Sequence, residues 1–271
     1  MKVTEILRLL FKRERALVHS TTETLVFAHR GSKCNRPENT LAAFEEAVRT
    51  GADGIELDVH LSKDQELMVI HDESVERTTT GTGLVRDLMR SELQKFDAGL
   101  KFDRRFMDQK IPALSEVLKT LVELNFTGIL NIEIKTDKYN YPEIESILSR
   151  QMTAQNWPFR HIYCSFNFDT LRKMSEIEPG TELCYLTYNN KQEIQRGMKA
   201  DFIQAIHPIK FFVFSHKIRA KHSPKALRIW TVNTEAEMRQ AFKLQLAGFM
   251  TDEPALAMKI KQDVKHARFE A

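Results

Sequence analysis

Short apolar segments alternate with amphipathic segments along most of the chain, and this alternation constrains the fold more than any other feature. Each apolar segment has the length of one strand, and each segment between them has the hydrophobic spacing of a helix that buries one side. Strands are expected at Leu25–Arg30, Gly54–Val59, Gly128–Lys135, His161–Ser165, Glu182–Thr187, Asp201–Ile206, Leu227–Val232 and Gly248–Thr251. Helices are expected at Thr40–Arg49, Ser115–Leu124, Pro142–Gln151, Thr170–Ile177, Gln192–Lys199, Phe212–Lys221 and Glu235–Leu244.

Strands that alternate with helices are typical of a parallel sheet, and this number of repeats predicts an α/β fold of the (β/α)₈ TIM barrel type. The alternative is a doubly wound sheet, which usually has fewer strands and a glycine-rich turn after the first one. The first strand is instead followed by His29-Arg30-Gly31, which lacks that glycine pattern. The barrel is therefore the favoured fold.

One connection is much longer than the others. About fifty residues separate the second strand from the next helix, and they include an alternating segment, Glu66–His71, and a Thr/Gly cluster at 78–83. A connection of this length in a compact barrel is usually functional, and this one leaves the carboxyl end of a strand, where barrel enzymes carry their chemistry. We expect a small insertion after the second strand, at about residues 60–111, over the site.

The first part of the chain has a different pattern. Residues 1–24 are expected to form an amphipathic helix, and the barrel is expected over residues 25–271. Packing of this helix against the bottom of the barrel is favoured over a weak membrane-surface contact through residues 1–18, because so short a basic helix binds membranes weakly.

Charge and cysteine content exclude several classes of protein. The 40 Lys and Arg residues are interspersed with 37 Asp and Glu residues, which argues against a nucleic-acid-binding surface but not against a small anionic ligand. Three scattered cysteines favour a reducing compartment. With no signal peptide or transmembrane segment recognisable, a cytoplasmic location is expected.

Several acidic residues occupy strand positions whose side chains are expected to point into the barrel. Glu56 and Asp58 share one face of their strand, and Glu133 shares a face with Lys135 on the next barrel strand. These residues can form an internal ion-pair cluster, but three acids against one lysine leave excess negative charge. A hard divalent cation is therefore the favoured interpretation.

Two histidines lie at the ends of expected strands beside charged residues. His29 precedes Arg30, and His71 precedes Asp72. Two imidazoles can divide general base and general acid roles near neutral pH, and a guanidinium suits phosphate oxygens. The histidines without such neighbours are interpreted as structural; they are His19, His161, His207, His216, His222 and His266.

Several short motifs occur in order along the chain. They are H-R-G (29–31), P-E-N-T (37–40), E-L-D-V (56–59), H-D (71–72), E-I-K (133–135), W-T-V-N (230–233) and T-D-E-P (251–254). With this order and spacing, the chain resembles the glycerophosphodiester phosphodiesterase family from about Leu25 to about Ala257.

The resemblance implies a function and a role for each matching position. It implies hydrolysis of small glycerophosphodiesters to glycerol 3-phosphate and an alcohol, on a (β/α)₈ barrel. His29 and His71 match catalytic histidines, with Arg30 beside them, and Arg30 and Lys135 match phosphate contacts. Trp230 matches an aromatic residue that lines the substrate pocket. Glu56, Asp58 and Glu133 match ligands of one divalent cation, Mg²⁺ or Ca²⁺.

Three alternative functions remain open, and the sequence departs from the family pattern at one place. A phospholipase C-like enzyme or a lysophospholipase D-like lyase would share a barrel, acids and histidines, and a non-enzymatic ligand-binding barrel is the alternative from another class. The departure is His207-Pro208, followed by an aromatic segment at 211–214. This segment is interpreted as helix packing rather than a contact for an alcohol or a lipid. Glu38 is interpreted as a residue that holds its loop.

Overall fold

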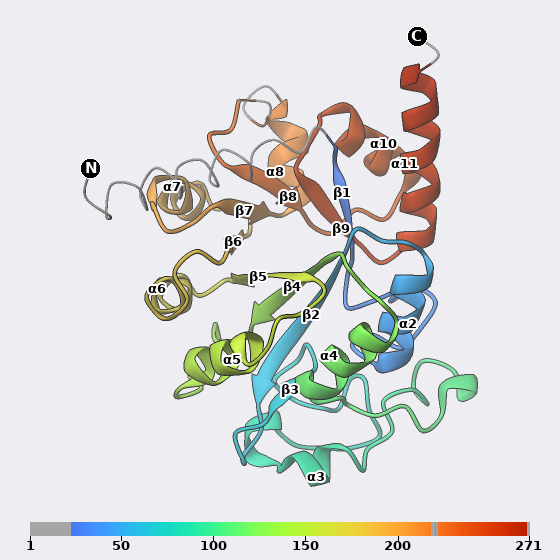
Figure 1. Ribbon diagram of the computed structural model, residues 1–271, viewed down its shortest axis with the longest axis vertical. Coiled ribbons are helices and arrows are strands. Elements are labelled where there is room, and N and C mark those ends of the chain that lie inside the picture. Colours follow the sequence, from blue (N-terminus) through green and yellow to red (C-terminus); the bar gives the residue numbers. More distant parts are fainter. Residues whose placement is uncertain (1–22, 218–219, 221, 270–271) are drawn as a thin grey trace.

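Eight parallel strands close into a barrel in the computed structural model, which describes residues 23–217, 220 and 222–269 (Figure 1). In barrel order these strands are β1 (Leu25–Ala28), β2 (Gly54–Leu61), β4 (Ile129–Ile134), β5 (Arg160–Ser165), β6 (Leu183–Thr187), β7 (Ala205–Pro208), β8 (Ala226–Ile229) and β9 (Gly248–Thr251). The barrel closes because β1 pairs with both β2 and β9. The prediction of a (β/α)₈ barrel is confirmed. The expected helix over residues 1–24 lies almost wholly outside the described residues.

Helices follow the barrel strands and cover the outside of the barrel. They are α2 (Leu41–Arg49), α4 (Leu114–Glu123), α5 (Ile144–Thr153), α6 (Phe168–Ile177), α7 (Lys191–Lys199), α8 (Lys210–Ser215), α10 (Glu235–Lys243) and α11 (Pro254–Phe269). Several begin at a side chain that caps the free backbone amides of the first turn, as Thr40 does for α2 and Asn167 for α6. The last helix, α11, was not among the predicted segments.

Some strand ends differ from the prediction for local reasons. Arg30 adopts a left-handed backbone conformation with φ of 54°, so β1 ends at Ala28 and not at Arg30. β7 begins at Ala205, because residues 201–204 belong to the turn after α7. The Lys225 ammonium holds that turn by donating to the carbonyl groups of Ala200 and Ile203.

The barrel wall separates two apolar layers. On β2, Ile55, Leu57 and Val59 point outward into the layer beneath the helices and have no exposed surface. The apolar layer inside the barrel contains one large ring, that of Phe27. Smaller side chains pack around this ring, among them Ile162, Cys164, Cys184 and Met250. All three cysteines are free thiols. The cytoplasmic location and the lack of a nucleic-acid partner stay predictions.

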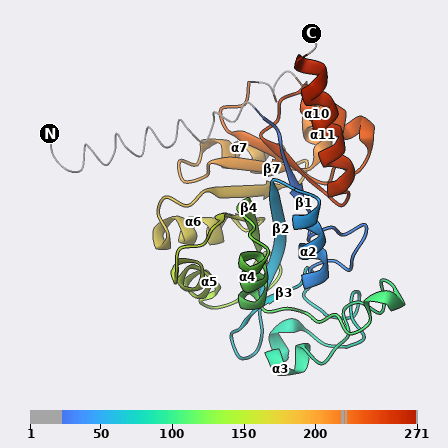
Figure 2. The same cartoon turned by 45° about the vertical axis from the view of Figure 1, so that its right-hand side comes forward.

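The expected insertion after β2 is present and has its own small core. β2 runs beyond the barrel and pairs with antiparallel β3 (Leu67–Val69), after which come short turns and α3 (Arg90–Leu93). The insertion gathers at the end of the molecule remote from the carboxyl end of α11 (Figure 1 and Figure 2). Its buried side chains form a separate cluster; they are Met68, Ile70, Val75, Val85, Leu93, Ala98, Ile111 and Ala113.

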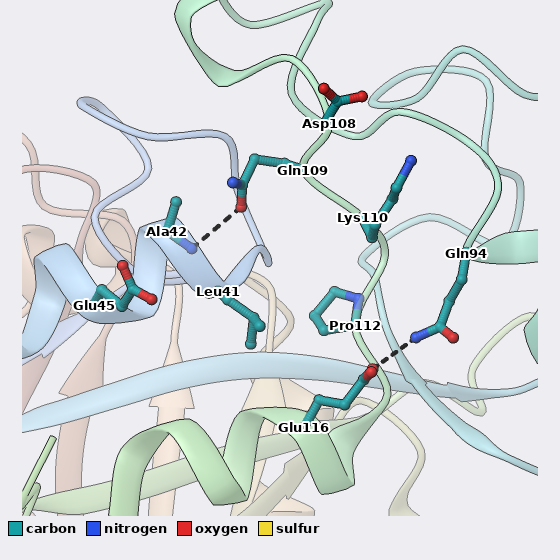
Figure 3. Close-up of a pocket in the computed structure, with 9 residues that line it drawn as sticks. All are labelled: Leu41, Ala42, Glu45, Gln94, Asp108, Gln109, Lys110, Pro112 and Glu116. Atoms are coloured by element: carbon teal, nitrogen blue, oxygen red, sulfur yellow. Dashed lines mark hydrogen bonds between the residues drawn. The ribbon is translucent and has the colours of Figure 1, made fainter. Parts of the chain in front are cut away.

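A groove of about 410 Å³ marks the boundary between the insertion and the barrel helices (Figure 3). Only two hydrogen bonds between its lining residues cross it, one from Ala42 N to Gln109 Oε1 (3.4 Å) and one from Gln94 Nε2 to Glu116 Oε2 (2.7 Å). At this boundary the buried cluster of the insertion stays separate from the apolar core around the barrel.

The aromatic segment at 211–214 forms most of α8. Phe212 and Phe214 pack against the outer apolar layer, and Val213 is fully buried. Phe211 differs, since it is 60% exposed. Among the described residues, no helix is long and apolar enough to cross a membrane.

We expect the two cores to unfold separately. Leu93 in the insertion core and Leu118 beneath α4 are both buried, and each Leu→Ala change should cost about 2–5 kcal/mol. Leu118→Ala should lower the melting temperature of the barrel. Leu93→Ala should mainly accelerate amide hydrogen exchange within residues 73–110. Mass-spectrometric exchange that accelerated equally in the barrel strands would contradict this separation.

Candidate active site

Three carboxylates meet inside the barrel where β2 and β4 run side by side. Parallel pairing places Asp58 beside Glu133, and Glu56 lies one inward position earlier on β2. All three residues are buried, with at most 7% of their surface exposed. One oxygen from each lies within 4.8 Å of the others. Strand register, and not loop conformation, therefore holds this acidic cluster together.

The protein supplies several hydrogen-bond donors to the acidic cluster, but too few to satisfy every carboxylate oxygen. The Arg30 amide donates to Glu56 Oε2 (2.9 Å), and Asn39 Nδ2 donates to Asp58 Oδ2 (2.8 Å). Lys135 Nζ donates to Glu133 Oε1 at 2.8 Å and lies 3.8 Å from Asp58 Oδ1. Asp58 Oδ1 is buried and accepts no hydrogen bond from any described residue.

This imbalance shifts the pKa values within the cluster. Burial, together with the charges of Asp58 and Glu133, raises the pKa of Glu56 well above its ordinary value. Burial likewise raises the pKa of Glu133 in spite of Lys135. For Asp58, burial is outweighed by the charges of Arg30 and Lys135, which hold its pKa below its usual range.

Another buried carboxylate, that of Glu182, has its negative charge compensated by the protein. At the other end of the barrel, Glu182 accepts a hydrogen bond from Arg228 Nη1 (2.6 Å) and lies 3.4 Å from Arg160 Nη2. The protein supplies two guanidinium groups for that one carboxylate. The acidic cluster, in contrast, holds three carboxylates with an unfilled oxygen. Hard oxygen donors in this number fit a divalent cation such as Mg²⁺ or Ca²⁺.

His29 lies in the turn after β1, beside the cluster. Its Nδ1 contacts Asp252 Oδ1 at 2.6 Å, and its Nε2 lies 4.0 Å from Glu56 Oε2. Because a carboxylate can only accept, Nδ1 carries the proton and the Nε2 lone pair is free toward the cluster. Burial and the charge of Arg30 lower the pKa of His29, although Asp252 opposes them. Asn233 Nδ2 in turn donates to Asp252 Oδ2 (2.8 Å).

His71 lies just beyond β3, and its neighbours hold it on two sides. Its Nδ1 contacts Asp72 Oδ1 at 2.5 Å. Its backbone carbonyl accepts from His60 Nε2 (3.0 Å), and Tyr141 donates its hydroxyl hydrogen to His60 Nδ1 (2.8 Å). Burial lowers the pKa of His60 to about 4, so this ring is neutral at physiological pH. His60 therefore positions His71 through its main chain.

An ionic network ties the insertion to the first loop of the barrel. Arg77 pairs with Asp72 (Nε to Oδ2, 2.6 Å) and with Glu38 (Nη2 to Oε1, 2.7 Å). Glu38 also accepts from Arg30 Nη1 (2.9 Å). Burial opposes ionisation of Glu38, but Arg77 and Arg30 outweigh it and lower its pKa to about 2. The network thus connects the neighbourhood of His71 to Arg30.

Trp230 lies across the barrel mouth from β2, beyond the end of β8. Its Nε1 donates to the carbonyl group of His207 (2.7 Å), which fixes the indole ring. Phe166 and Tyr188 contact it, with ring centres 5.7 and 5.5 Å from the indole, and they stack on each other at 4.8 Å. These three rings, which we call the aromatic wall, follow the ends of β5, β6 and β8.

The structure brings most of the residues expected at the site together. Direct contacts connect Arg30, Lys135 and the three acids, and His29 lies beside Glu56; Trp230 belongs to the opposite side. Sequence reasoning missed Asp252, Asn233 and His60 as positioning residues. A signal existed for each of them. Asp252 and Asn233 lie in motifs already noted, and His60 continues the inward alternation of Glu56 and Asp58.

Fold and site together define a barrel enzyme, with its polar groups gathered at the carboxyl ends of the strands. The sequence profile of the glycerophosphoryl diester phosphodiesterase family matches residues 29–256. The chain therefore belongs to this family and is an enzyme. The predicted family is confirmed, and the non-enzymatic alternative is excluded.

Individual relatives agree with this assignment. The chain is 39% identical over 233 residues to a glycerophosphodiester phosphodiesterase of Caldanaerobacter subterraneus subsp. tengcongensis, covering 86% of this chain and 95% of the relative. It is also 39% identical to one of Bacillus altitudinis, covering 89% and 100%. The structure of an Oleispira antarctica phosphodiesterase in complex with the product sn-glycerol-3-phosphate matches with a TM-score of 0.77 at 26% identity, covering 90% of this chain and 97% of that one.

Charge repulsion in the acidic cluster predicts an unusual stability effect. Because the pKa of Glu56 is raised in the folded state, its contribution to stability is full at low pH and is lost as pH rises. In chelator at about pH 8, Glu56→Gln should therefore melt at a higher temperature than the wild type, and the difference should shrink toward low pH. Calorimetry over a pH series measures this.

The control is Glu182→Gln, which removes a balanced carboxylate. It leaves Arg228 buried with a weaker partner, so it should destabilise the protein, by up to about 3–5 kcal/mol. A lower melting temperature for both variants in chelator would show that the acidic cluster carries no uncompensated charge.

Proposed function

We propose that this enzyme hydrolyses glycerophosphodiesters to glycerol 3-phosphate and an alcohol, with His29 and His71 as general base and general acid. The observation that carries the proposal is the arrangement of the two histidines. Each has its Nδ1 paired with an aspartate, at 2.6 Å for His29 and 2.5 Å for His71, and both lie beside the acidic cluster. The product named for the Oleispira antarctica relative supports the glycerol 3-phosphate half of the proposal.

Glu56, Asp58 and Glu133 would hold one divalent cation, Mg²⁺ or Ca²⁺, with the oxygens that lie within 4.8 Å of one another. Bound there, the cation supplies Lewis-acid neutralisation of charge on the phosphoryl oxygens.

Arg30 and Lys135 bind the phosphate group in this proposal. Carboxylates hold both positively charged side chains in place: Glu38 and Asp58 contact Arg30, and Glu133 contacts Lys135. A guanidinium has five N–H groups and an ammonium has three, so each keeps donors for a ligand. Lys135 is buried, and only 12% of the Arg30 side chain is exposed. Because both side chains are already held by carboxylates, they offset the charge that develops on the phosphoryl group without reorganising.

His29 accepts the proton of the nucleophile on Nε2, which is the free nitrogen of its neutral ring. The lowered pKa keeps this ring neutral at physiological pH, as a base requires. Asp252 holds the ring orientation and stabilises the imidazolium once it has formed. His71 gives a proton to the departing alcohol oxygen as the P–O bond breaks. The nucleophile is water, or the neighbouring glycerol hydroxyl through a cyclic phosphate that water then opens.

The aromatic wall lies on the other side of the barrel mouth and offers an apolar surface for the carbon atoms of the substrate. Its rings come from three different strand ends, so the barrel keeps the wall at a fixed distance from the acidic cluster. We assign Trp230 to substrate binding on this ground, with Phe166 and Tyr188 supporting it.

Replacing either histidine should lower turnover strongly without unfolding the protein. His29→Gln and His71→Gln keep a polar group beside the aspartates but cannot transfer a proton, so kcat should fall by at least about 100-fold. His161→Gln is the matched control. His161 also pairs with a carboxylate, Glu178 at 2.8 Å, but at the amino end of β5, so its turnover should stay near wild type. Wild-type turnover in either His29→Gln or His71→Gln would remove that residue from the mechanism.

The product should be glycerol 3-phosphate from several different substrates. Glycerophosphocholine, glycerophosphoethanolamine and glycerophosphoglycerol share the same glycerophosphate half, and a coupled glycerol 3-phosphate dehydrogenase assay detects that half after cleavage. His29→Gln measures the background. If the whole panel is inert while a lysolipid or a phosphoinositide gives a cyclic phosphate, then the lyase or phospholipase alternative is correct.

A further inference from the structure

A small pocket opens beside the site, between the loop after β1 and the insertion. Its volume is about 210 Å³, and its walls come from both segments: Lys33, Pro37 and Glu38 from the loop, and Thr78, Ala98 and Phe102 from the insertion, together with Arg77 and Lys101. None of the roles proposed above uses this pocket.

The side chains that line the pocket carry more positive than negative charge. Lys33, Arg77 and Lys101 contribute three cationic groups, and Glu38 contributes one carboxylate. Asp72, which pairs with Arg77, and Asp252, which lies 3.9 Å from Lys33, are not among the lining residues. The Glu38 carboxylate is already shared between Arg30 and Arg77, and Lys33 Nζ lies 3.9 Å from it, so three cations surround it. A cationic ligand would therefore be repelled here, and an anionic ligand would be attracted.

Lys33 has the donors to bind such an anion. Its Nζ donates no hydrogen bond to any described residue, and its two nearest carboxylate oxygens, Glu38 Oε2 and Asp252 Oδ2, are both 3.9 Å away. Its side chain is 30% exposed, so the ammonium is partly desolvated but reachable. Across the pocket, Lys101 Nζ donates to the carbonyl group of Glu76 and keeps two further hydrogens.

The pocket is one side chain away from the groups proposed to act on the phosphodiester. Glu38 connects it to Arg30 at 2.9 Å, and Asp252 connects Lys33 to His29. The pocket therefore adjoins the residues proposed to act on the phosphodiester.

We propose that this pocket is a second anion subsite, which binds a phosphate or carboxylate group carried by the alcohol half of the substrate. The inference rests on the proposed function and narrows it, because it predicts a preference for glycerophosphodiesters whose alcohol is itself anionic. Lys33 and Lys101 bind the anion, and Arg77 adds positive charge while holding Glu38.

Two substrates that differ by one glycerophosphate test the proposal. They are glycerophosphoglycerol and bis(glycerophospho)glycerol, in which the leaving glycerol carries a second phosphate. Initial rates of glycerol 3-phosphate release give kcat/KM for each. In the wild type, kcat/KM should be about tenfold higher for the doubly charged substrate. This is the order expected for a hydrogen bond between charged groups. It exceeds the statistical factor of about two, which arises because the doubly charged substrate has two cleavable bonds.

Lys33→Gln and Lys101→Gln should each reduce this ratio, with Lys33→Gln bringing it close to the statistical factor. The matched control is Lys119→Gln, since Lys119 lies on α4 with a 77% exposed side chain and should leave the ratio unchanged. Inorganic phosphate should inhibit cleavage of the doubly charged substrate more strongly than cleavage of the singly charged one, because it competes for the pocket.

The outcomes separate this subsite from the proposed function. Cleavage of both substrates with the same ratio in wild type, Lys33→Gln and Lys101→Gln would overturn the subsite and leave the proposed hydrolysis intact. An equal loss on both substrates in Lys33→Gln would place Lys33 at the scissile phosphate and would also overturn the subsite. Cleavage of neither substrate by the wild type would overturn both proposals.

Discussion

Three carboxylates buried within 4.8 Å of one another are the constraint on which the rest of the site depends. Their mutual repulsion and loss of hydration are costly, and Lys135 and Arg30 compensate only part of the charge. The protein tolerates this because β2 and β4 hold the acids in register, and the surrounding barrel is well packed. Stability is given up at this point, in a cluster whose three carboxylates could hold a divalent cation.

Hydrogen bonds to neighbouring residues hold the side chains and main-chain groups that surround the acidic cluster. The Arg30 amide binds Glu56, Asp252 orients His29, and His60 holds the main chain of His71. The insertion has its own core but is tied to the barrel through Arg77 and Glu38. Rigid strands thus place the acids, whereas an ionic network places the histidine that the insertion carries.

The barrel and the acidic cluster were predictable because they follow from strict alternation. Outward Ile55, Leu57 and Val59 and inward Glu56 and Asp58 can be read from the strand period alone. Strand ends such as Ala28 were not predictable, because a left-handed conformation at Arg30 ends β1. The partners Asp252 and Asn233 lie about 200 residues from His29, and only closure of the barrel brings them to it.

The most direct test of the acidic cluster is a calorimetric titration of the metal-stripped enzyme with Mg²⁺ and with Ca²⁺, in parallel with turnover of a glycerophosphodiester. We expect one binding site per chain, lost in Asp58→Asn, and turnover that chelator abolishes and the cation restores. Asp58 supplies the buried oxygen that no described residue satisfies, so its loss should affect binding most. No binding of either cation, together with full turnover in chelator, would contradict the account.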